Sequence, residues 1–288
     1  MDDIKKVTLE DENYPKALKI LGDAPRVLYY IGRLPEKGEK CFSIVGTRRP
    51  SPYGQQATLQ FAGELADAGL TIVSGMAPGI DTFAHKICVE KEKRTIAVLG
   101  TGLDEKSIYP QINLPLAKKI IKTGGCLISE LPPSTHGSRF TFPKRNRIIS
   151  ALGLGVLIVE AKEKSGSLIT ASYAKHQGKK VFAVPGQIFT QNAKGPNKLI
   201  KEGATLTENV GDILKELGLE RQKIIQKEFF AKNPEENLIL QSLKEESLYI
   251  DKIIEKTKLE APVVATTLAL MEISGKIRNL GGNVYSLN

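Results

Sequence analysis

Residues 140–185 read FTFPKRNRIISALGLGVLIVEAKEKSGSLITASYAKHQGKKVFAVP, and three consecutive elements of the fold can be predicted from them. It contains a basic segment (Lys144–Arg147), an apolar run that ends in an acid (Gly155–Glu160), and a group of small polar residues (Ser165–Ser167). This order predicts the start of one helix, a buried strand, and the start of a second helix.

Both helix starts are suited to holding anions. Pro143 fits the first position of a helix, where its missing N–H would have no partner in any case. The amides that follow it, together with the guanidinium of Arg145 or Arg147, predict a phosphate-sized cluster of donors. Ser165 can cap the second helix, and Gly166 allows a ligand to approach the backbone closely.

Two aromatic residues, Phe140 and Phe142, stand beside the first cluster. Single-stranded nucleic acid requires this combination, because cations neutralise phosphates while unpaired bases stack on rings. The net charge of +9 has the same implication, since residues 38–218 hold 24 basic and 15 acidic residues, an excess of 9. A polyanion partner such as DNA is the first interpretation, and a solvated lysine-rich surface is the alternative.

Cysteine usage and hydropathy indicate the cellular compartment in which the chain is expected. The three cysteines, Cys41, Cys88 and Cys126, form no C-x-x-C pair, which argues against a disulfide framework and against a zinc site. A reducing cytoplasm is the simplest compartment. The acidic N-terminus and the lack of an apolar run approaching about 18 residues predict neither a signal peptide nor a membrane span.

Six short apolar runs alternate with segments of helical period, which predicts a parallel α/β sheet. The runs are Phe42–Val45, Leu70–Val73, Thr95–Leu99, Cys126–Ser129, Val156–Val159 and Val181–Val184. In such sheets the carboxyl ends of the strands share one edge, where ligands bind. We expect residues 38–218 to form this domain, preceded by a lead-in segment (1–37) that packs on the core, and followed by a helical linker (219–231).

Residues 232–288 show three helical segments and then two short strands around Gly281-Gly282, the pattern of a winged helix. The third helix, at about Pro262–Met271, contains no Arg, Lys, Asn or Gln with which to address base edges. We therefore expect a protein-contact or regulatory module. Lys276 and Arg278 on the wing remain candidate phosphate contacts.

Loops at the shared sheet edge supply further candidates. Arg48 follows the first strand and is well placed to contact phosphate, with an ion pair to Glu130 or Asp81 as the alternative. The glycine-rich segment from Ser74 and Gly75 to Gly79 opens a helix, as an anion cradle does.

Asp81 and His85 lie one helical turn apart, which suits either a general base with its orienting group, a pair of metal ligands, or a structural hydrogen-bonded pair. No third ligand or nucleophile is fixed by spacing. Nucleotide fingerprints fail, because Gly100 to Glu105 lacks the last glycine of G-x-G-x-x-G and no Walker motif is present. We predict no cofactor, no metal and no catalytic residue.

Several segments in order resemble the bacterial DNA-processing protein A family (DprA, also called Smf): VGTRRPSPYG (45–54), SGMAPGIDTFAH (74–85), FTFPKRNRIISAL (140–152), VEAKEKSGSLITA (159–171) and VFAVPG (181–186). The resemblance implies a Rossmann-like core with a winged helix. It also implies a cytoplasmic protein of DNA recombination and natural transformation that binds single-stranded DNA, helps to load the RecA recombinase and forms dimers through its α/β domain. The expected DNA contacts are Arg48, Ser74, Gly75, Phe142, Lys144, Arg145, Asn146, Arg147, Ser165, Gly166 and Ser167.

An enzyme is the rival hypothesis, because phosphoribohydrolases have similar Rossmann-like pockets. Those enzymes carry a glutamate shortly after a glycine-rich turn, whereas the comparable turn here, Ser165 to Ser172, has no carboxylate. A sequence-specific regulator that reads DNA with its winged helix is a third interpretation.

Overall fold

The structure is a computed structural model that describes residues 3–219, 231, 233–244 and 247–287. The chain divides into two compact units, residues 1–220 and 221–288. The linker expected at 219–231 falls almost entirely outside the described residues, and the expected domain boundaries remain predictions.

The first unit is built on a sheet of order β1-β2-β6-β5-β4-β3-β7-β8-β9. The strands are β1 (Lys5–Thr8), β2 (Val27–Gly32), β3 (Cys41–Val45), β4 (Thr71–Ser74), β5 (Thr95–Val98), β6 (Cys126–Ser129), β7 (Gly155–Ile158), β8 (Lys180–Ala183) and β9 (Thr205–Leu206). Strands β3 to β8 are the six predicted apolar runs, and every pairing among them is parallel. The α/β fold class is confirmed.

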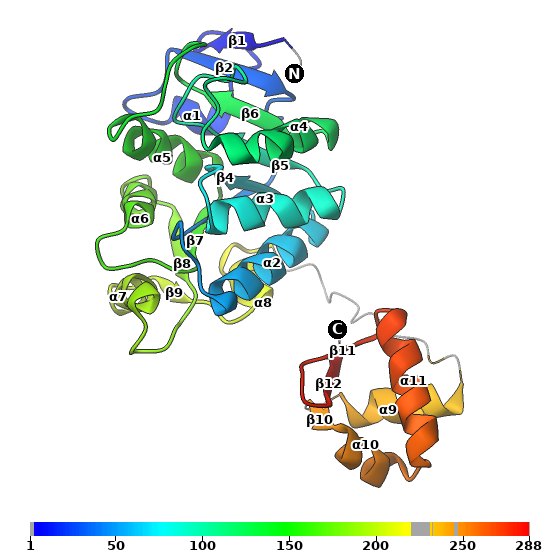
Figure 1. Ribbon diagram of the computed structural model, residues 1–288. Helices are drawn as coiled ribbons and strands as arrows, with labels where there is room; N and C mark the ends of the chain where they lie inside the picture. Colours follow the sequence, from blue (N-terminus) through cyan, green and yellow to red (C-terminus); the bar gives the residue numbers. More distant parts are fainter. Residues whose placement is uncertain (1–2, 220–230, 232, 245–246, 288) are drawn as a thin grey trace. The chain divides into compact units, whose positions relative to one another are not determined.

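Helices cover both faces of this sheet, which explains why its strands are continuously apolar. In Figure 1, α5 (Thr141–Leu152), α6 (Gly166–His176) and α7 (Lys194–Lys201) lie on one side, and α2 (Pro52–Asp67), α3 (Ile80–Glu90) and α4 (Leu114–Lys122) lie on the other. Helix α8 (Val210–Glu216) contacts α2, and two short 3-10 turns, η1 (Gln111–Asn113) and η2 (Gln191–Ala193), precede α4 and α7. Ile44 and Leu157, paired across β3 and β7, are fully buried in the core.

The topology places a ligand-binding position between β3 and β7. From β3 the chain proceeds through β4 to β5 in one direction, whereas from β7 it proceeds through β8 to β9 in the other. Loops diverge at such a switch point and leave a crevice outside the carboxyl ends of the two strands. The residues after β3, from Gly46 onward, and those after β7, from Val159 onward, therefore border the same crevice.

Residues 5–32 extend the sheet with β1 and β2, which pair antiparallel with each other, and β2 in turn pairs antiparallel with β6. Helix α1 (Lys16–Lys19) lies between β1 and β2 in the chain. Tyr14 anchors this segment, because its ring is buried and its hydroxyl donates to the Pro25 carbonyl over 2.7 Å.

Helix α5 begins at Thr141, two residues earlier than predicted. The amide of Phe142 donates to the Ser138 carbonyl and that of Lys144 to the Phe140 carbonyl. Pro143 is therefore the third residue of the helix, and the amide after it is not free. The prediction that these amides form an anion cluster was wrong.

The second unit has the predicted winged-helix elements. Three helices, α9 (Pro234–Ser242), α10 (Ile250–Thr257) and α11 (Ala261–Ile273), enclose a core with a three-stranded sheet of order β10-β12-β11. The strands are β10 (Leu248–Tyr249), β11 (Ile277–Asn279) and β12 (Val284–Leu287). Lys276 is buried and pairs with Glu236 at 2.5 Å, so the hypothesis that it contacts phosphate was wrong.

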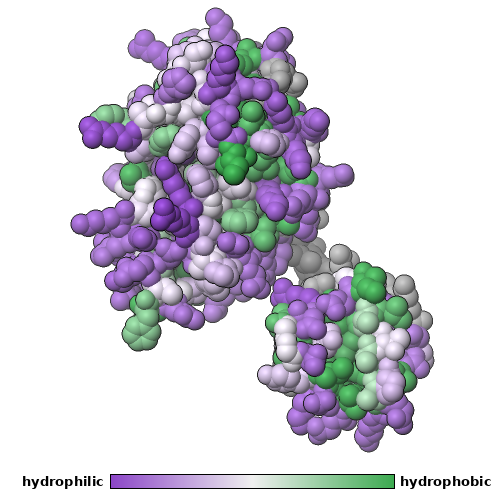
Figure 2. All heavy atoms as spheres, viewed as in Figure 1, coloured by the Kyte–Doolittle hydropathy of each residue, from purple (hydrophilic) through white to green (hydrophobic). Residues whose placement is uncertain are grey.

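Figure 2 shows a hydrophobic band across this unit, where α11 lies in Figure 1. Val263, Leu270 and Ile273 of α11 are exposed. Among the described residues of both units, no helix combines the length and the apolar character needed to cross a membrane.

Candidate nucleic-acid interface

A groove of about 740 Å³ lies at the switch point, bordered by the loop after β3, the first turns of α5 and the start of α6. Its lining includes six cationic side chains, Arg48, Arg49, Arg139, Arg145, Lys162 and Lys164. Asp81 is the one carboxylate among the described residues that line it. A low-dielectric wall with one sign of charge concentrates anions, so the groove is suited to a phosphate chain.

Arg48 is exposed at the mouth of the groove, and its guanidinium carbon lies 5.6 Å from the centroid of the Phe142 ring. The ring is fixed between the backbone at Gly100 and Gly137, because a Cβ at either glycine would collide with it. Tyr109, half exposed, meets Phe142 at a centroid distance of 5.6 Å. This cation and these two rings form one continuous surface.

The alternative role for Arg48, an ion pair with Glu130 or Asp81, is not what the described residues show. Glu130 pairs instead with Lys144 at 3.3 Å and with Arg147 at 2.7 Å. Asp81 accepts hydrogen bonds from the amides of Gly75 and Ala77.

Arg145 was predicted to offer its guanidinium to phosphate, and the structure assigns it another role. Its side chain is 5% exposed, and Nη1 donates to the carbonyls of Gly75 (2.5 Å) and Val98. Burial lowers the pKa of Arg145 to about 10, while Asp81 opposes that shift, so the group stays protonated at neutral pH. Arg145 braces the floor of the groove by joining α5 to the ends of β4 and β5.

Arg147 is also buried and does not line the groove. It pairs with Glu130 and, at 2.8 Å, with Asp23 of the N-terminal segment. Its predicted phosphate contact is wrong because both carboxylates already hold the guanidinium. Lys144, by contrast, keeps 58% of its side chain exposed and remains a candidate contact beside the groove.

Ser74 and Gly75 do not form an anion cradle. The Ser74 hydroxyl is buried and donates to the Ile44 carbonyl, while the Gly75 amide donates to Asp81 over 3.1 Å. Glycine is required at 75, because a Cβ there would lie 2.6 Å from the Arg145 guanidinium. The donors that the sequence offered at this loop are used within the protein.

The start of α6 faces the groove as predicted. Ser165 caps the helix by accepting from the Ser167 amide at 3.3 Å, and no atom lies within 4 Å of the place where a Cβ on Gly166 would stand. Asn146 ties α5 to this turn, because its Nδ2 donates to the Gly166 carbonyl. The N-terminus of α6 thus presents its dipole to the groove.

Asp81 and His85 are buried and serve the structure. His85 Nδ1 lies 2.8 Å from the Thr95 hydroxyl, and burial lowers the pKa of His85 to about 3. Burial also raises the pKa of Asp81, although Arg145 and the amide donors act against that shift. Among the described residues, no three His, Cys, Asp or Glu side chains are grouped to hold a metal ion.

Glu160 fills the position at which the first helix of a dinucleotide-binding fold would hold phosphate. Its carboxylate accepts from the Ser51 amide (2.9 Å) and hydroxyl (2.5 Å) at the N-terminus of α2, and from Asn192 Nδ2 at 3.3 Å. A Cβ on Gly54 would collide with this carboxylate. The protein supplies its own anion at this helix.

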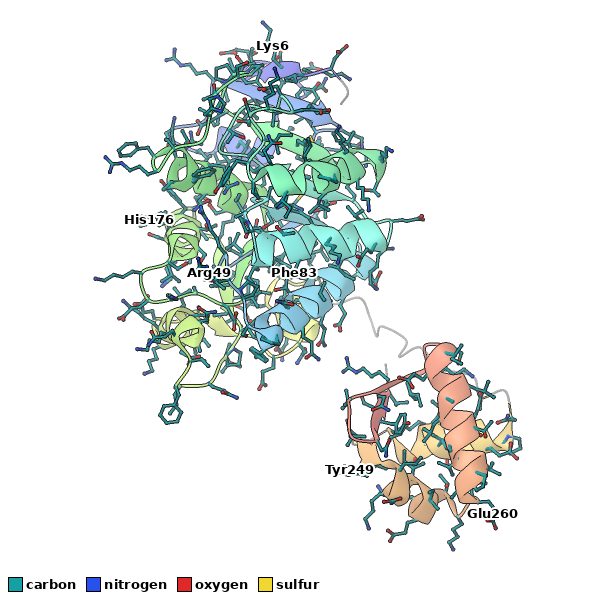
Figure 3. All side chains as sticks on the ribbon, viewed as in Figure 1. Lys6, Arg49, Phe83, His176, Tyr249 and Glu260 are labelled. Carbon is teal, nitrogen blue, oxygen red and sulfur yellow. The ribbon has the colours of Figure 1, made fainter. Side chains whose placement is uncertain are left out.

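The sequence did not predict four cations of the groove, Arg49, Arg139, Lys162 and Lys164, or the ring of Tyr109. All lie in loops, where no periodicity indicates the direction of a side chain. The one indication of their role in the sequence is that each follows a strand of the sheet: the four cations follow β3, β6 or β7, and Tyr109 follows β5. In Figure 3, Arg49 lies between the helices that Figure 1 labels α6 and α2.

Comparison with known proteins identifies the family. The model of DNA recombination-mediator protein A matches residues 5–218, and the model of the DprA winged helix domain matches residues 230–283. The chain belongs to the DNA recombination-mediator protein A family. The predicted resemblance is thereby confirmed, and the chain takes its place among proteins of DNA processing and recombination.

Curated relatives agree with this placement. DNA processing protein DprA of Bacillus subtilis is 45% identical, over 74% of this chain and 71% of the relative. Protein Smf of Escherichia coli is 36% identical, over 98% of this chain and 77% of the relative.

Two solved structures share the fold over most of this chain. DprA from Streptococcus pneumoniae gives a TM-score of 0.69 at 40% identity, covering 74% of both chains. DprA from Helicobacter pylori, described for its single-stranded DNA binding mode, gives 0.64 at 34% identity, covering 74% of this chain and 95% of the other.

Proposed function

We propose that this chain binds single-stranded DNA along the groove and holds it without altering it chemically. The observation that carries the proposal is the exposed guanidinium of Arg48 over the ring of Phe142, at the mouth of a groove lined by cations. A strand placed there has phosphates near cations and bases near rings, whereas a duplex hides its bases from the rings.

The distribution of donors supports a backbone contact that is independent of base sequence. Arg48, Arg49, Lys162 and Lys164 stand on loops around the groove, and the N-terminus of α6 adds a partial positive charge. Such groups position phosphates but do not read bases. The single-stranded DNA binding mode described for the Helicobacter pylori relative supports the same class of ligand.

The absence of catalysis is part of the proposal. A phosphoribohydrolase needs a carboxylate that is free to stabilise a developing cation, yet Glu160 is held by Ser51 and Asn192, and Asp81 is held by amides beneath the groove. We expect no hydrolysis of AMP, ATP or DNA, with or without divalent metal ions. Turnover that disappears in Glu160→Ala would support the enzyme instead.

Transfer of the bound strand to the RecA recombinase, action in natural transformation, and a homodimer formed through the α/β unit complete the proposal, and all rest on family membership. A cytoplasmic location fits the cysteines Cys41, Cys88 and Cys126, which are buried as free thiols.

Charge-removal variants test the proposal. Arg48→Ala should weaken binding of oligo-dT and of mixed-sequence oligonucleotides to the same extent, because it removes a phosphate contact. Lys122→Ala is the matched control, since Lys122 is exposed at the last residue of α4, near the opposite edge of the sheet. Equal effects of the two variants, measured by fluorescence anisotropy, would exclude the groove.

A further inference from the structure

A second cavity, of about 500 Å³, opens at the same edge of the sheet beyond the ends of β7 and β8. Its walls are Pro52 and Tyr53 in the first turn of α2, Pro185 and Gly186 after β8, and Ala193 before α7. The size is that of a small-molecule site. The walls are mainly apolar, unlike those of the groove at Arg48.

Two large apolar side chains stand exposed in the loop that borders this cavity. Ile188 is 74% exposed and Phe189 is 91% exposed, and the Tyr53 ring in the cavity wall is 51% exposed. Adjacent aromatic and aliphatic groups in water are costly to leave uncovered, and such a patch marks a binding site. Gln187 and Thr190 of this loop line the cavity, whereas Ile188 and Phe189 are not part of its lining. The Tyr53 ring supplies the aromatic surface inside the cavity, and Phe189 offers a second ring on the bordering loop.

The loop is held in place by side chains on either side of it. Asn197 Nδ2 donates to the Gly186 carbonyl and its Oδ1 accepts from the Gly186 amide, at 2.9 and 3.1 Å. Asn192 Nδ2 lies 3.0 Å from the Arg49 carbonyl, which links the loop to the groove. The Tyr53 hydroxyl donates to the Pro185 carbonyl over 2.8 Å, so the ring is oriented before any ligand arrives.

The charges around the cavity indicate which part of a strand enters it. The Glu160 carboxylate is part of its lining and would repel a phosphate. Burial, together with Glu160 and Glu208, raises the pKa of Tyr53, so the phenol stays neutral and keeps its hydrogen bond to Pro185. Cations flank the cavity, with Arg49 on the side of the groove and Lys194 directly after Ala193. These charges suit a neutral nucleobase inside the cavity, with one phosphate of the strand beside each flanking cation.

The order of the strands makes the two sites continuous. Phe142 packs against Gly100 after β5, and the second cavity lies at β7 and β8, in the order β5-β4-β3-β7-β8. Neighbouring strands are about 4.8 Å apart, so four spacings separate the two sites by about 19 Å along the edge. Arg48 and Arg49, after β3, lie between them.

We infer that the cavity at Tyr53, together with the exposed ring of Phe189 on the loop that borders it, is a second subsite for an unpaired nucleobase, occupied by the same DNA strand that crosses Arg48. This inference rests on the proposed function, and it extends the binding site from β5 to β8.

The test is a ladder of labelled oligo-dT lengths, from about 4 to 16 nucleotides, titrated against the full chain by fluorescence anisotropy. The reference length is the shortest oligonucleotide whose binding is weakened by Arg48→Ala. Phe189→Leu, which removes the ring but keeps an apolar side chain, should leave affinity unchanged at that length. It should weaken binding of longer oligonucleotides roughly fivefold or more.

Two controls isolate stacking. Phe189→Tyr keeps a ring and should retain the affinity for long oligonucleotides, and Ile20→Ser removes a side chain that is 67% exposed at the end of α1 and should have no effect. If Phe189→Leu binds every length as the unaltered protein does while Arg48→Ala does not, the second subsite is refuted and the groove stands. A Phe189→Leu variant that changes the oligomeric state without changing DNA affinity would assign the patch to a second copy of the chain. Failure of the unaltered protein to bind any length would refute the proposed function itself.

Discussion

Arg145 and Arg48 line the same groove, yet the structure predicts opposite consequences for their removal. Arg145→Met deletes a buried cation and leaves the carbonyls of Gly75 and Val98 without their donor. It also removes the positive charge that offsets buried Asp81. Each orphaned buried carbonyl costs about 1–3 kcal/mol, and the loss of the charge that offsets Asp81 adds to this, so the whole loss is about 3–5 kcal/mol.

A loss of about 3–5 kcal/mol should lower the melting temperature of a unit of this size by roughly 6–20 °C. Arg48→Ala removes an exposed side chain and should change the melting temperature by about 2 °C or less. Circular dichroism of the two variants of the full chain, with anisotropy titrations alongside, measures both effects. An Arg145→Met variant that melts like the unaltered protein but binds DNA poorly would show that Arg145 contacts the strand.

Three further predictions concern other parts of the chain. The pKa of His85 is about 3 in the folded protein and about 6.5 in the unfolded chain. The stability that its neutral ring contributes is therefore present above pH 6.5 and is lost as the pH falls toward 3. In urea titrations, this contribution to the free energy of unfolding should fall by about 1.4 kcal/mol per pH unit, and it should be absent in His85→Gln. Phe142→Ala should cost about 1–3 kcal/mol in oligo-dT binding, and an unchanged affinity would exclude base stacking there. Deletion after Leu219 should leave single-strand affinity within about threefold, or ~0.7 kcal/mol, because α11 contains no Arg, Lys, Asn or Gln with which to address base edges. Tight binding of one duplex sequence by the second unit would contradict this prediction.

The sequence predicted the fold well, because the parallel sheet depends on short-range patterns. Each strand from β3 to β8 is a continuous apolar run, and helices cover both faces of the sheet. The hydropathy of each run is therefore the one that a strand buried on both faces requires. The winged helix was likewise readable from the apolar spacing of its helices and from Gly281-Gly282.

The site was predicted less completely, because the roles of its cations depend on distant partners. Arg145 bonds to carbonyls 70 and 47 residues away, and Arg147 is held by Asp23 and Glu130. Nothing in the segment Lys144–Arg147 distinguishes a buried arginine from an exposed one. Arg48 was identified correctly as exposed at the sheet edge because the end of β3 fixes its position, whereas its contact with DNA stays a prediction.

The role of Glu160 also depends on a residue that is distant in the sequence. An acidic residue after a buried strand can be a catalytic group or can accept hydrogen bonds at the N-terminus of a helix. Only the position of Ser51, 109 residues earlier in the chain, distinguishes these two roles. The structure gives it the second role.

Binding of single-stranded DNA along the groove is best tested by comparing labelled oligo-dT with a duplex of equal length over a series of salt concentrations. We predict tighter binding of the single strand, with log K falling linearly against log salt by roughly 0.7 for each phosphate contact, and a slope smaller by about that amount in Arg48→Ala. Equal affinity for the duplex, or an affinity that does not respond to salt, would contradict this prediction.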